Sequence, residues 1–437
     1  MATTAVSAPV ADAFDHLTRL VAGLDPTGIG HLADGTGTGV DLDALARARP
    51  EWPPWPTPSL AMLVGPPAVV PRRLDLTWLH RFDASCRLLD AIVAGLGGPM
   101  GGPSALSLLV ERAALLRHRT WGTTSAGTSC RLLPGADRWV AINLPRPDDI
   151  DAVPALAGLL GAEIAVGGDD AGGAGVWDAL APIIAATPAA DVLAAARVLG
   201  LAVAVAPHLR SSTSEAPTTP GAPAVPSALV VTPGSAASQA TPSRPLRVVD
   251  LSSLWAGPLC GWYLVRAGAD VVKVESSTRP DGARAGSPAF WRRLNGDKTL
   301  VELDLAATGG VEQLRRLLAA ADVVIEASRP RAMAGFGIDP AEVIARGGIW
   351  CSISGHGRTD GDRIAFGDDA AVAGGLVADT GDEPWFIGDA AADPIAGVTA
   401  ALGVASLWAA GRGGFVDVAM SSAVAALTGG GPVTCVP

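Results

Sequence analysis

The stretch Leu246–Glu275, which reads LRVVDLSSLWAGPLCGWYLVRAGADVVKVE, decides the fold class. Two short β-branched runs, Leu246–Leu251 and Asp270–Glu275, flank the segment Gly257–Ala267, whose apolar residues recur at helical spacing. A strand, a helix and a second strand within about 30 residues are typical of a βαβ unit. The two strands of such a unit are parallel. The stretch therefore predicts part of a parallel sheet.

The same alternation continues towards the C-terminus and extends the predicted sheet. Strand-like runs alternate with helical segments, and helices between parallel strands cover both faces of the sheet. We therefore predict a doubly wound α/β domain, with ligands bound at the carboxyl ends of its strands. The further predicted helices are 309–320, 340–345 and 394–409, and the further predicted strands are 323–326, 349–353 and 415–418.

A change of composition divides the chain ahead of this domain. Residues 211–245 are rich in Pro, Ser, Thr and Ala, and only Glu215 and Arg244 are charged. Such a segment buries too little apolar surface to offset its ordering entropy, so we predict a flexible linker over 211–245. The large domain then occupies 246–437.

Two regions precede the predicted linker. Residues 126–210 predict a small α+β domain, with a hairpin over Cys130–Leu144, a helix near Asp191–Leu199 and a strand at Ala202–Ala206. Residues 1–125 predict a poorly defined region that is helical in pieces over Leu74–Leu116 and irregular at Trp52–Pro56.

Charge and cysteine content narrow the class of protein. The 437 residues include 32 Lys and Arg against 43 Asp and Glu, a formal charge of −11 without a basic cluster, which disfavours nucleic acid as a partner. Five scattered cysteines without a CxxC pair disfavour a disulfide scaffold and fit a reducing, cytoplasmic location. The longest apolar stretch without charge, Pro394–Gly411, could span a bilayer by length. It is rich in Ala and Gly, so we expect a buried helix and no membrane association.

Common cofactor motifs are missing from the sequence. The predicted turn at Asp250–Pro258 lacks GxGxxG, which disfavours a dinucleotide cofactor. The glycine cluster Gly167–Gly175 carries two aspartates where a pyrophosphate would approach, so a surface loop is the better interpretation. The six histidines form no pair at ligand spacing, and we expect no metal site.

Asp393 differs from the other carboxylates near the predicted strand ends. It directly precedes the apolar run that starts at Pro394, which predicts Asp393 at the N-cap of that helix. The residue is then either an ordinary cap or a carboxylate held at a buried helix start, beside small residues that leave room for a substrate. We predict that the other carboxylates near the strand ends are solvated charges in loops: Asp368, Asp369, Asp379, Asp382, Glu383 and Asp389.

Seven sequence blocks in a fixed order resemble one family. They are VVDLSSLWAGPLC, LVRAGADVVKVE, LNGDKTLVELDL, ADVVIEASRPRAMAGFGID, IWCSISGHG, the Asp393-x3-Gly397-x5-Gly403 pattern and GRGGFVDVAM. Residues 246–427 thereby resemble the class III coenzyme A transferases, the family of formyl-CoA and carnitine-CoA transferases that includes the α-methylacyl-CoA racemases. The resemblance implies a Rossmann-like large domain with a smaller α+β domain. It also implies an interlocked homodimer that binds acyl-CoA and carboxylic acids as substrates and holds no cofactor tightly.

The resemblance also implies roles for particular residues. Asp393 matches the nucleophile, which attacks an acyl-CoA and forms an aspartyl anhydride and then an aspartyl-CoA thioester. Backbone donors for the oxyanions are expected among 354–357 and 429–431. Arg284, Lys298 and Arg329 are expected to meet phosphates. The positions that match CoA contacts are Trp255, Ala256, Arg284, Leu294, Asn295, Lys298, Ala327, Ser328, Arg329, Ser354, Gly355 and His356.

The chain departs from the family pattern at three points. Ala327-Ser328 replaces an Asn-Phe pair, and Asp368-Asp369 replaces the His-Asp pair of the racemases. The small domain precedes the large one, which resembles a circular permutation or a fusion of two partial copies. Two alternatives to CoA transfer stay open: an acyl-CoA racemase or isomerase that uses Asp368 or Asp369 with Asp393, and a non-catalytic CoA-binding paralogue.

Overall fold

The computed structural model describes residues 73–120, 122–164, 174–211, 227–236 and 244–436, together with His16, Arg19 and Leu63. The sequence predictions for Trp52–Pro56 and for most of the Gly167–Gly175 cluster lie outside these residues.

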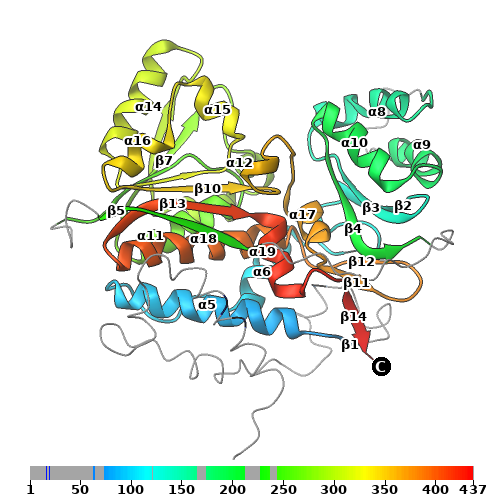
Figure 1. Cartoon of the computed structure of the whole chain (residues 1–437), viewed down its shortest axis with the longest axis horizontal. Coiled ribbons are helices and arrows are strands. Elements are labelled where there is room, and N and C mark those ends of the chain that lie inside the picture. The colour runs from blue at the N-terminus through cyan, green and yellow to red at the C-terminus, as the bar shows by residue number, and fades with distance from the viewer. Residues whose placement is uncertain are drawn as a thin grey trace, which may run out of the picture.

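A seven-stranded sheet forms the centre of the large domain (Figure 1), as the sequence predicts. Its order is β5-β13-β10-β9-β6-β7-β8, and every neighbouring pair is parallel except β5 with β13. From β6 the chain adds β7 and β8 on one side and β9, β10 and β13 on the other. The order therefore reverses between β6 and β9, and such a switch point leaves a crevice for a ligand at the carboxyl ends of the strands. The bounds are β6 Arg247–Asp250, β7 Asp270–Ser276, β8 Thr299–Leu303, β9 Val323–Glu326, β10 Ile349–Ser354 and β13 Arg412–Ala419.

Helices cover both faces of this sheet (Figure 1). Because side chains of a strand alternate between faces, Val248 of β6 joins one apolar core and Val249 joins the other. The first core lies against α11 (Ala256–Arg266) and α18 (Ala392–Ala409), and the second lies against α14 (Thr308–Ala320) and α16 (Pro340–Ala345). Shorter helices follow β7, β9 and β13: α12 (Gly282–Gly286) and α13 (Pro288–Asn295) after β7, α15 (Pro330–Gly335) after β9 and α19 (Met420–Thr428) after β13.

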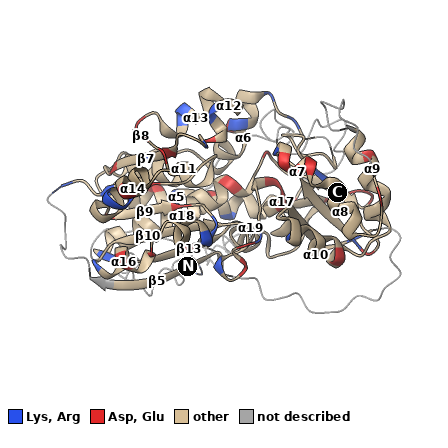
Figure 2. Ribbon diagram, turned by 90° about the horizontal axis from the view of Figure 1, so that it is seen from above, with Lys and Arg blue, Asp and Glu red and all other residues tan. Residues whose placement is uncertain are grey.

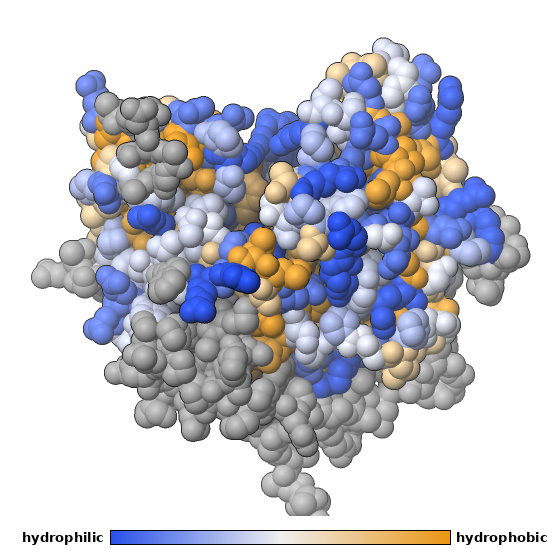
Figure 3. Space-filling view, turned by 180° about the vertical axis from the view of Figure 1, so that it is seen from behind, coloured by the Kyte–Doolittle hydropathy of each residue, from blue (hydrophilic) through white to orange (hydrophobic). Residues whose placement is uncertain are grey.

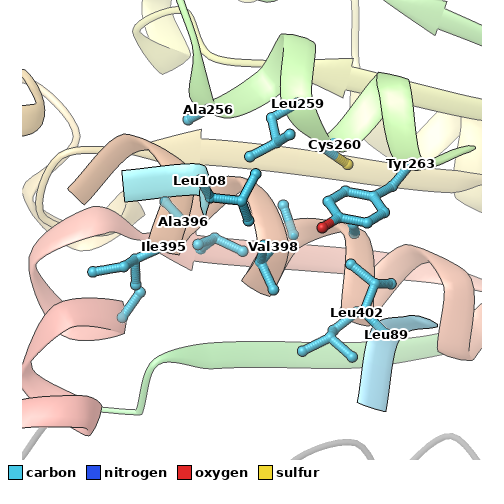
Figure 4. Packing of buried hydrophobic residues seen from close by; sticks show 14 of the residues in the cluster. Leu89, Leu108, Ala256, Leu259, Cys260, Tyr263, Ile395, Ala396, Val398 and Leu402 are labelled. Carbon is cyan, nitrogen blue, oxygen red and sulfur yellow. The ribbon is translucent and has the colours of Figure 1, made fainter. Parts of the chain in front are cut away.

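Helix α18 is buried on nearly all sides. It is the one helix of the described residues that is long and apolar enough to cross a bilayer, and 83% of it is buried inside the protein. A Cβ on Gly397 would lie 2.7 Å from the carbonyl oxygen of Ala256, and one on Gly403 would lie 2.7 Å from Val416. The two glycines of the sequence pattern thus allow α18 to approach α11 and β13 closely. Figure 4 shows this packing, with Leu259 of α11 above Ala396 and Val398 of α18.

The linker prediction over 211–245 is wrong for residues 229–236. These residues form the edge strand β5 (Leu229–Ala236), which pairs antiparallel with β13 through Leu229 with Val418 and Val231 with Val416. The β-branched run at Val230–Thr232 favours a strand, and Leu229 and Val231 are buried against the sheet. Pairing with β13 therefore outweighs the Pro- and Ser-rich surroundings.

The N-terminal region is also part of the large domain. Helices α5 (Thr77–Gly95) and α6 (Ala105–Leu116) contribute Leu89 and Leu108 to the same apolar core as α18, as Figure 4 shows. Strand β1 (Arg73–Leu74) joins β14 (Val433–Val436), β11 (Val377–Asp379) and β12 (Trp385–Phe386) in a second sheet. The prediction of a separate region over 1–125 is therefore wrong for residues 73–116.

The small domain lies between α6 and β5 in the chain. Its three strands, β2 (Cys130–Pro134), β3 (Arg138–Asn143) and β4 (Ala202–Arg210), form an antiparallel sheet. One sheet face packs on the domain's own helices, and the other packs on Val372 of α17 (Gly367–Ala373) and Phe386 of β12. The small domain is therefore joined to the large one through α17. Its helices are α7 Pro147–Asp151, α8 Val153–Leu159, α9 Ala174–Ala185 and α10 Ala189–Leu199.

Candidate active site

Asp393 lies in the first turn of α18 and its side chain remains partly exposed. The helix begins at Ala392, with its first turn closed by the bond from the Asp393 amide to the Ala390 carbonyl at 2.9 Å. The N-cap prediction is therefore wrong, because the turn starts earlier and Ala391 occupies the cap. The backbone amide of Ala256, at the start of α11, instead lies close enough to the Asp393 carboxyl group to lower its pKa. The unpaired amides of a helix start favour an anion at this place.

Buried polar groups fix the loop that carries Ala256. The backbone N–H of Leu254, a residue with a φ of 67°, donates to Asp281 Oδ1 at 3.0 Å. Asp250 accepts from the Ser252 amide at 3.0 Å, and Lys273 Nζ donates to the Ser252 carbonyl. The loop between β6 and α11 is thereby held from both sides, which fixes the amide that faces Asp393.

Lys298 belongs to the same buried network. Its Nζ donates to Asp250 Oδ2 at 2.8 Å, to the Pro258 carbonyl at 2.9 Å and to Asn295 Oδ1 at 2.9 Å. An ammonium group has three donors, so none remains for a phosphate. The expected phosphate contact of Lys298 is therefore wrong. Leu294 and Asn295 are likewise fully buried, so this part of the expected CoA site is core.

Two further carboxylates reach Asp393 from the start of α17. A Cβ on Gly367 would lie 2.2 Å from Asp393 Oδ2, which shows how closely this turn approaches the carboxylate. Asp368 Oδ1 accepts from the Ala390 amide at 2.8 Å. Asp369 Oδ1 accepts from the Phe366 amide at 2.9 Å. Both side chains are buried, so their prediction as solvated loop charges is wrong.

The small domain contributes directly to this cluster. Asn143 Nδ2, at the end of β3, donates to Asp369 Oδ1 at 2.9 Å, and Ser129 Oγ donates to Asn143 Oδ1 at 2.9 Å. The second oxygen of Asp369 is buried without a hydrogen-bond partner in the described part of the chain. The active-site carboxylates therefore lie where the two domains meet.

Burial changes the acidity of this cluster. The pKa of Asp393 is raised to about 7: burial is the largest cause, the charges of Asp368 and Asp369 act in the same direction, and Arg112 and the Ala256 amide act against them. Burial and the charge of Asp389 raise the pKa of Asp368 to about 6. Burial also raises the pKa of Asp369 to about 7. Values this close to neutrality are typical of groups that exchange a proton or act as nucleophiles near pH 7.

Two site residues from α6 and the loop after it carry no sequence signal. Arg112 Nη1 donates to Asp389 Oδ1 at 2.5 Å, and His118 Nδ1 lies 3.4 Å from Asp389 Oδ2. Asp389 is buried, which corrects its prediction as a solvated charge. Arg112 lies on an ordinary amphipathic helix 277 residues before Asp389, so only the tertiary structure shows the pair.

Three of the expected CoA-binding loops meet at the carboxyl edge of the sheet. Trp255 and Ala256 follow β6, 327–329 follow β9, and 354–356 follow β10. Figure 1 shows this edge facing the small domain, and Figure 3 shows a notch between the small domain and the lobe of α14 and α15. The loops after β6 and β9 border the switch point described above.

Several groups at this edge already have partners. Arg284 Nε donates to Glu275 at 2.8 Å and its guanidinium lies 3.7 Å from the Trp291 ring centroid. Burial and nearby arginines lower the pKa of His356 to about 3, so this imidazole is neutral. Ser328 Oγ donates to Glu326 at 2.7 Å. Arg284 is exposed, and Ser328 and His356 are partly exposed, so all three residues remain accessible to solvent.

The expected oxyanion donors are partly occupied. The Gly357 amide donates to Ser354 Oγ at 3.0 Å, and the amides of Gly429 and Gly430 donate to the Ala425 carbonyl at 2.8 and 3.1 Å. The Ala256 amide lowers the pKa of Asp393, so it is a further candidate donor for charge that develops at this carboxyl group. No group of three or more His, Cys, Asp or Glu side chains in the described ranges is arranged to hold a metal ion.

Alanine at position 367 is expected to disturb this site sterically. Its Cβ would lie 2.2 Å from Asp393 Oδ2 and 2.5 Å from the Ala390 carbonyl oxygen, so the backbone has to shift. A displacement near 1 Å lowers a rate on the order of 10²-fold, and overpacking costs about 1–3 kcal/mol. Thermal unfolding and acyl transfer from acyl-CoA measure the two effects.

Gly309→Ala is the matched control, because a Cβ at Gly309 meets nothing within 4 Å. The control is expected to retain full activity. A Gly367→Ala enzyme as active and as stable as this control would contradict the steric argument.

The fold and the site define an α/β protein in which a carboxyl group of raised pKa, that of Asp393, lies near the loop that follows β6. Residues 244–434 match the model of CoA-transferase family III, so this part of the chain is related to that family. The succinyl-CoA–D-citramalate CoA-transferase of Chloroflexus aurantiacus is 32% identical over 44% of this chain and 52% of its own. The succinate–glutarate CoA-transferase of Agrobacterium fabrum is 32% identical over 41% of this chain and 51% of its own.

A solved structure is also similar to part of this chain. The crystal structure of a CAIB/BAIF family protein from Brucella suis shares 32% identity over 43% of this chain and 55% of that chain, with a TM-score of 0.39. The chain thus spans about half the length of the curated relatives it matches.

Proposed function

We propose that the protein transfers coenzyme A from an acyl-CoA to a carboxylic acid, with Asp393 as the nucleophile. The observation that carries the proposal is the position of Asp393, a partly exposed residue at the start of α18 whose carboxyl group lies against the turn at Gly367 and has a pKa raised to about 7. The family relationship of residues 244–434 supports the same reaction.

The proposed reaction uses no group beyond the two substrates and this carboxylate. Asp393 attacks the thioester carbonyl carbon, the C–S bond breaks, and CoA leaves as a thiolate from a mixed anhydride. The thiolate attacks the aspartyl carbon of the anhydride, which releases the first acid and leaves an aspartyl-CoA thioester. The second acid attacks this thioester to form a second anhydride and expels the thiolate again. The thiolate then attacks its acyl carbon, which yields the new acyl-CoA and restores Asp393.

An arginine cluster is proposed to bind the CoA phosphates in place of Lys298. Burial is the largest cause that lowers the pKa of Arg329, and the charges of Arg331, Arg146 and Arg279 lower it as well, whereas Asp362 raises it. Arg329 caps α15 beside the switch point, and Arg146 belongs to the small domain. A phosphate between them would relieve the repulsion and accept bidentate hydrogen bonds. Lys and Arg are otherwise scattered over the elements in Figure 2.

The substrate class follows from the relatives only as a proposal. The names of the two relatives above pair succinyl-CoA or succinate with another dicarboxylic acid. Succinyl-CoA with glutarate is therefore the first pair to test. Intact-mass spectrometry after incubation with succinyl-CoA is expected to show a CoA adduct that hydroxylamine removes. Binding of CoA with no adduct from any acyl-CoA in a panel would refute the transferase and favour a non-catalytic paralogue.

Acyl-CoA racemisation is the second candidate function. Asp368 and Asp393 have pKa values of about 6 and 7, and the charge of Asp368 acts on the pKa of Asp393, so the two groups lie close enough to exchange protons with one substrate. Deuterium exchange at the α-carbon without exchange of labelled CoA would favour this reaction over transfer.

We also propose that the protein is a cytoplasmic homodimer, as the family resemblance implies. Four cysteines are free and buried in the described residues, Cys86, Cys130, Cys260 and Cys351, which fits a reducing compartment. Light scattering coupled to size exclusion tests the dimer.

Adduct formation is expected to rise with pH and to level off above about pH 7. Asp393 attacks as the carboxylate, and burial raises its pKa to about 7, so only about 3% is ionised at pH 5.5. The initial rate of adduct formation between pH 5.5 and 8.5 measures the midpoint. In Asp369→Asn the midpoint is expected at lower pH, because the charge of Asp369 raises the pKa of Asp393. A rate that is constant over this range would contradict the raised pKa.

A further inference from the structure

Arg112 reaches the active site from α6 with most of its donors unused. Its Nη1 donates to Asp389 Oδ1, and its guanidinium carbon lies 5.9 Å from the ring centroid of Trp255. That bond is the one hydrogen bond of the side chain within the ranges the structure describes, and 26% of the side chain is exposed. A guanidinium group has five N–H donors, so most of them remain free for a ligand.

Asp389 fixes Arg112 in this position. The Asp389 side chain is fully buried between Arg112 and His118, and the adjoining Ala390 amide donates to Asp368 at 2.8 Å. The loop that leads into α18 thus connects the arginine to the carboxylates around Asp393. A charge-assisted bond to a buried carboxylate holds a guanidinium group in a defined orientation.

Arg112 supplies a positive charge next to several carboxylates of the site. Asp368, Asp369 and Asp389 are buried around Asp393, and an attacking acid brings a further negative charge to the same place. Of all the nearby charges, that of Arg112 has the largest effect on the pKa of Asp393, which it lowers. The charge of Arg112 also lowers the pKa of Asp368. An anionic substrate next to these carboxylates requires such a cation.

We propose that Arg112 binds the attacking carboxylate of the acid substrate and holds it beside the Asp393 thioester. The inference rests on the proposed CoA transfer and names the residue that positions its second substrate. A planar guanidinium group matches a carboxylate through two parallel hydrogen bonds. Arg112 precedes the segment 244–434 that matches the family model, so in this proposal helix α6 adds a substrate contact from outside that segment.

Steady-state kinetics of Arg112→Gln test the proposal at about pH 8.5, where Asp393 is ionised even if its pKa rises by a unit. The KM for the acid is expected to rise about 10- to 100-fold, since a charge-assisted hydrogen bond is lost. The rate of CoA-adduct formation, which needs no acid, is expected to change less than about 3-fold. Arg112→Lys keeps the positive charge but not the planar guanidinium group. Its KM for the acid is expected to lie between those of the wild type and of Arg112→Gln. Arg119→Gln, an exposed arginine after the same helix, is the matched control.

Acetate and succinate as acceptors sharpen the test. Both are expected to lose affinity alike, because each attacks through one carboxylate. A loss confined to succinate would overturn the proposal, since Arg112 would then bind the distal carboxylate. An unchanged KM for both acids would overturn it as well.

Two controls separate the possible failures. If the wild-type protein forms no adduct with any acyl-CoA, the proposed function fails and the role of Arg112 fails with it, whereas a wild-type adduct with an unchanged KM in Arg112→Gln overturns the role of Arg112 alone. If Arg112→Gln does not fold, the double variant Arg112→Gln/Asp389→Asn removes the unpaired buried charge and is measured in its place.

Discussion

Asparagine at position 393 is expected to lower CoA transfer by on the order of 10⁴-fold, the loss typical of a removed nucleophile. The neutral amide cannot form the anhydride, so no CoA adduct is expected by intact mass. The fold is expected to persist, because burial already favours the neutral form of this side chain by raising the pKa of Asp393 to about 7.

Asp382→Asn provides the control for this substitution. Asp382 is an exposed aspartate in the loop between β11 and β12, so its substitution is expected to leave the rate unchanged. An adduct that persists in Asp393→Asn would contradict the assignment and would direct attention to Asp368 and Asp369. Peptide mapping of the adduct would then identify the modified carboxylate.

Methionine at position 298 is expected to destabilise the fold by about 3–5 kcal/mol, as the loss of one partner of a buried ion pair does. Lys298 is buried and donates to Asp250 Oδ2 at 2.8 Å. Lys298 and Lys273 together hold the pKa of Asp250 below its usual value, so Asp250 is charged. Without Lys298, this buried charge loses one of its two cationic partners. Urea unfolding monitored by circular dichroism measures the loss.

An exposed ion pair gives the comparison for Lys298. Arg316 lies 3.8 Å from Glu312 on α14 and is 78% exposed, so Arg316→Met is expected to cost less than about 1 kcal/mol. The double variant Asp250→Asn/Lys298→Met is expected to recover part of the stability lost in Lys298→Met. Equal unfolding free energies for Lys298→Met and Arg316→Met would contradict the proposed network.

The large domain could be predicted from sequence where local pattern and tertiary environment agree. The strands at 323–326 and 349–353 are buried in the sheet centre, where β-branched and apolar runs are required. Strand β5 could not be predicted, because its neighbours in sequence have the composition of a linker and its partner β13 lies far along the chain. The position of α5 and α6 in the core could not be predicted either, because their packing partners in α18 also lie far along the chain.

The site could be predicted only at its centre. Asp393 is marked by the small residues after it, whereas the burial of Asp368 and Asp369 depends on contacts with Ala390 and Asn143 from elsewhere in the chain. Lys298 shows the opposite case, since a lysine within a family motif suggests a ligand contact although the folded chain satisfies it internally. Sequence pattern identifies which residue types are present, and tertiary contacts decide which of them a substrate can reach.

The shared core of α5, α6 and α18 also sets the order in which the chain can fold during synthesis. Arg112 precedes Asp389 by 277 residues, so at about 5–20 residues per second the ribosome needs on the order of 14 to 55 seconds to make the segment between them. Throughout that interval Leu89 and Leu108 lack Ile395 and Leu402, their partners in the finished core. The apolar faces of α5 and α6 therefore lack these partners until the residues of α18 have been synthesised.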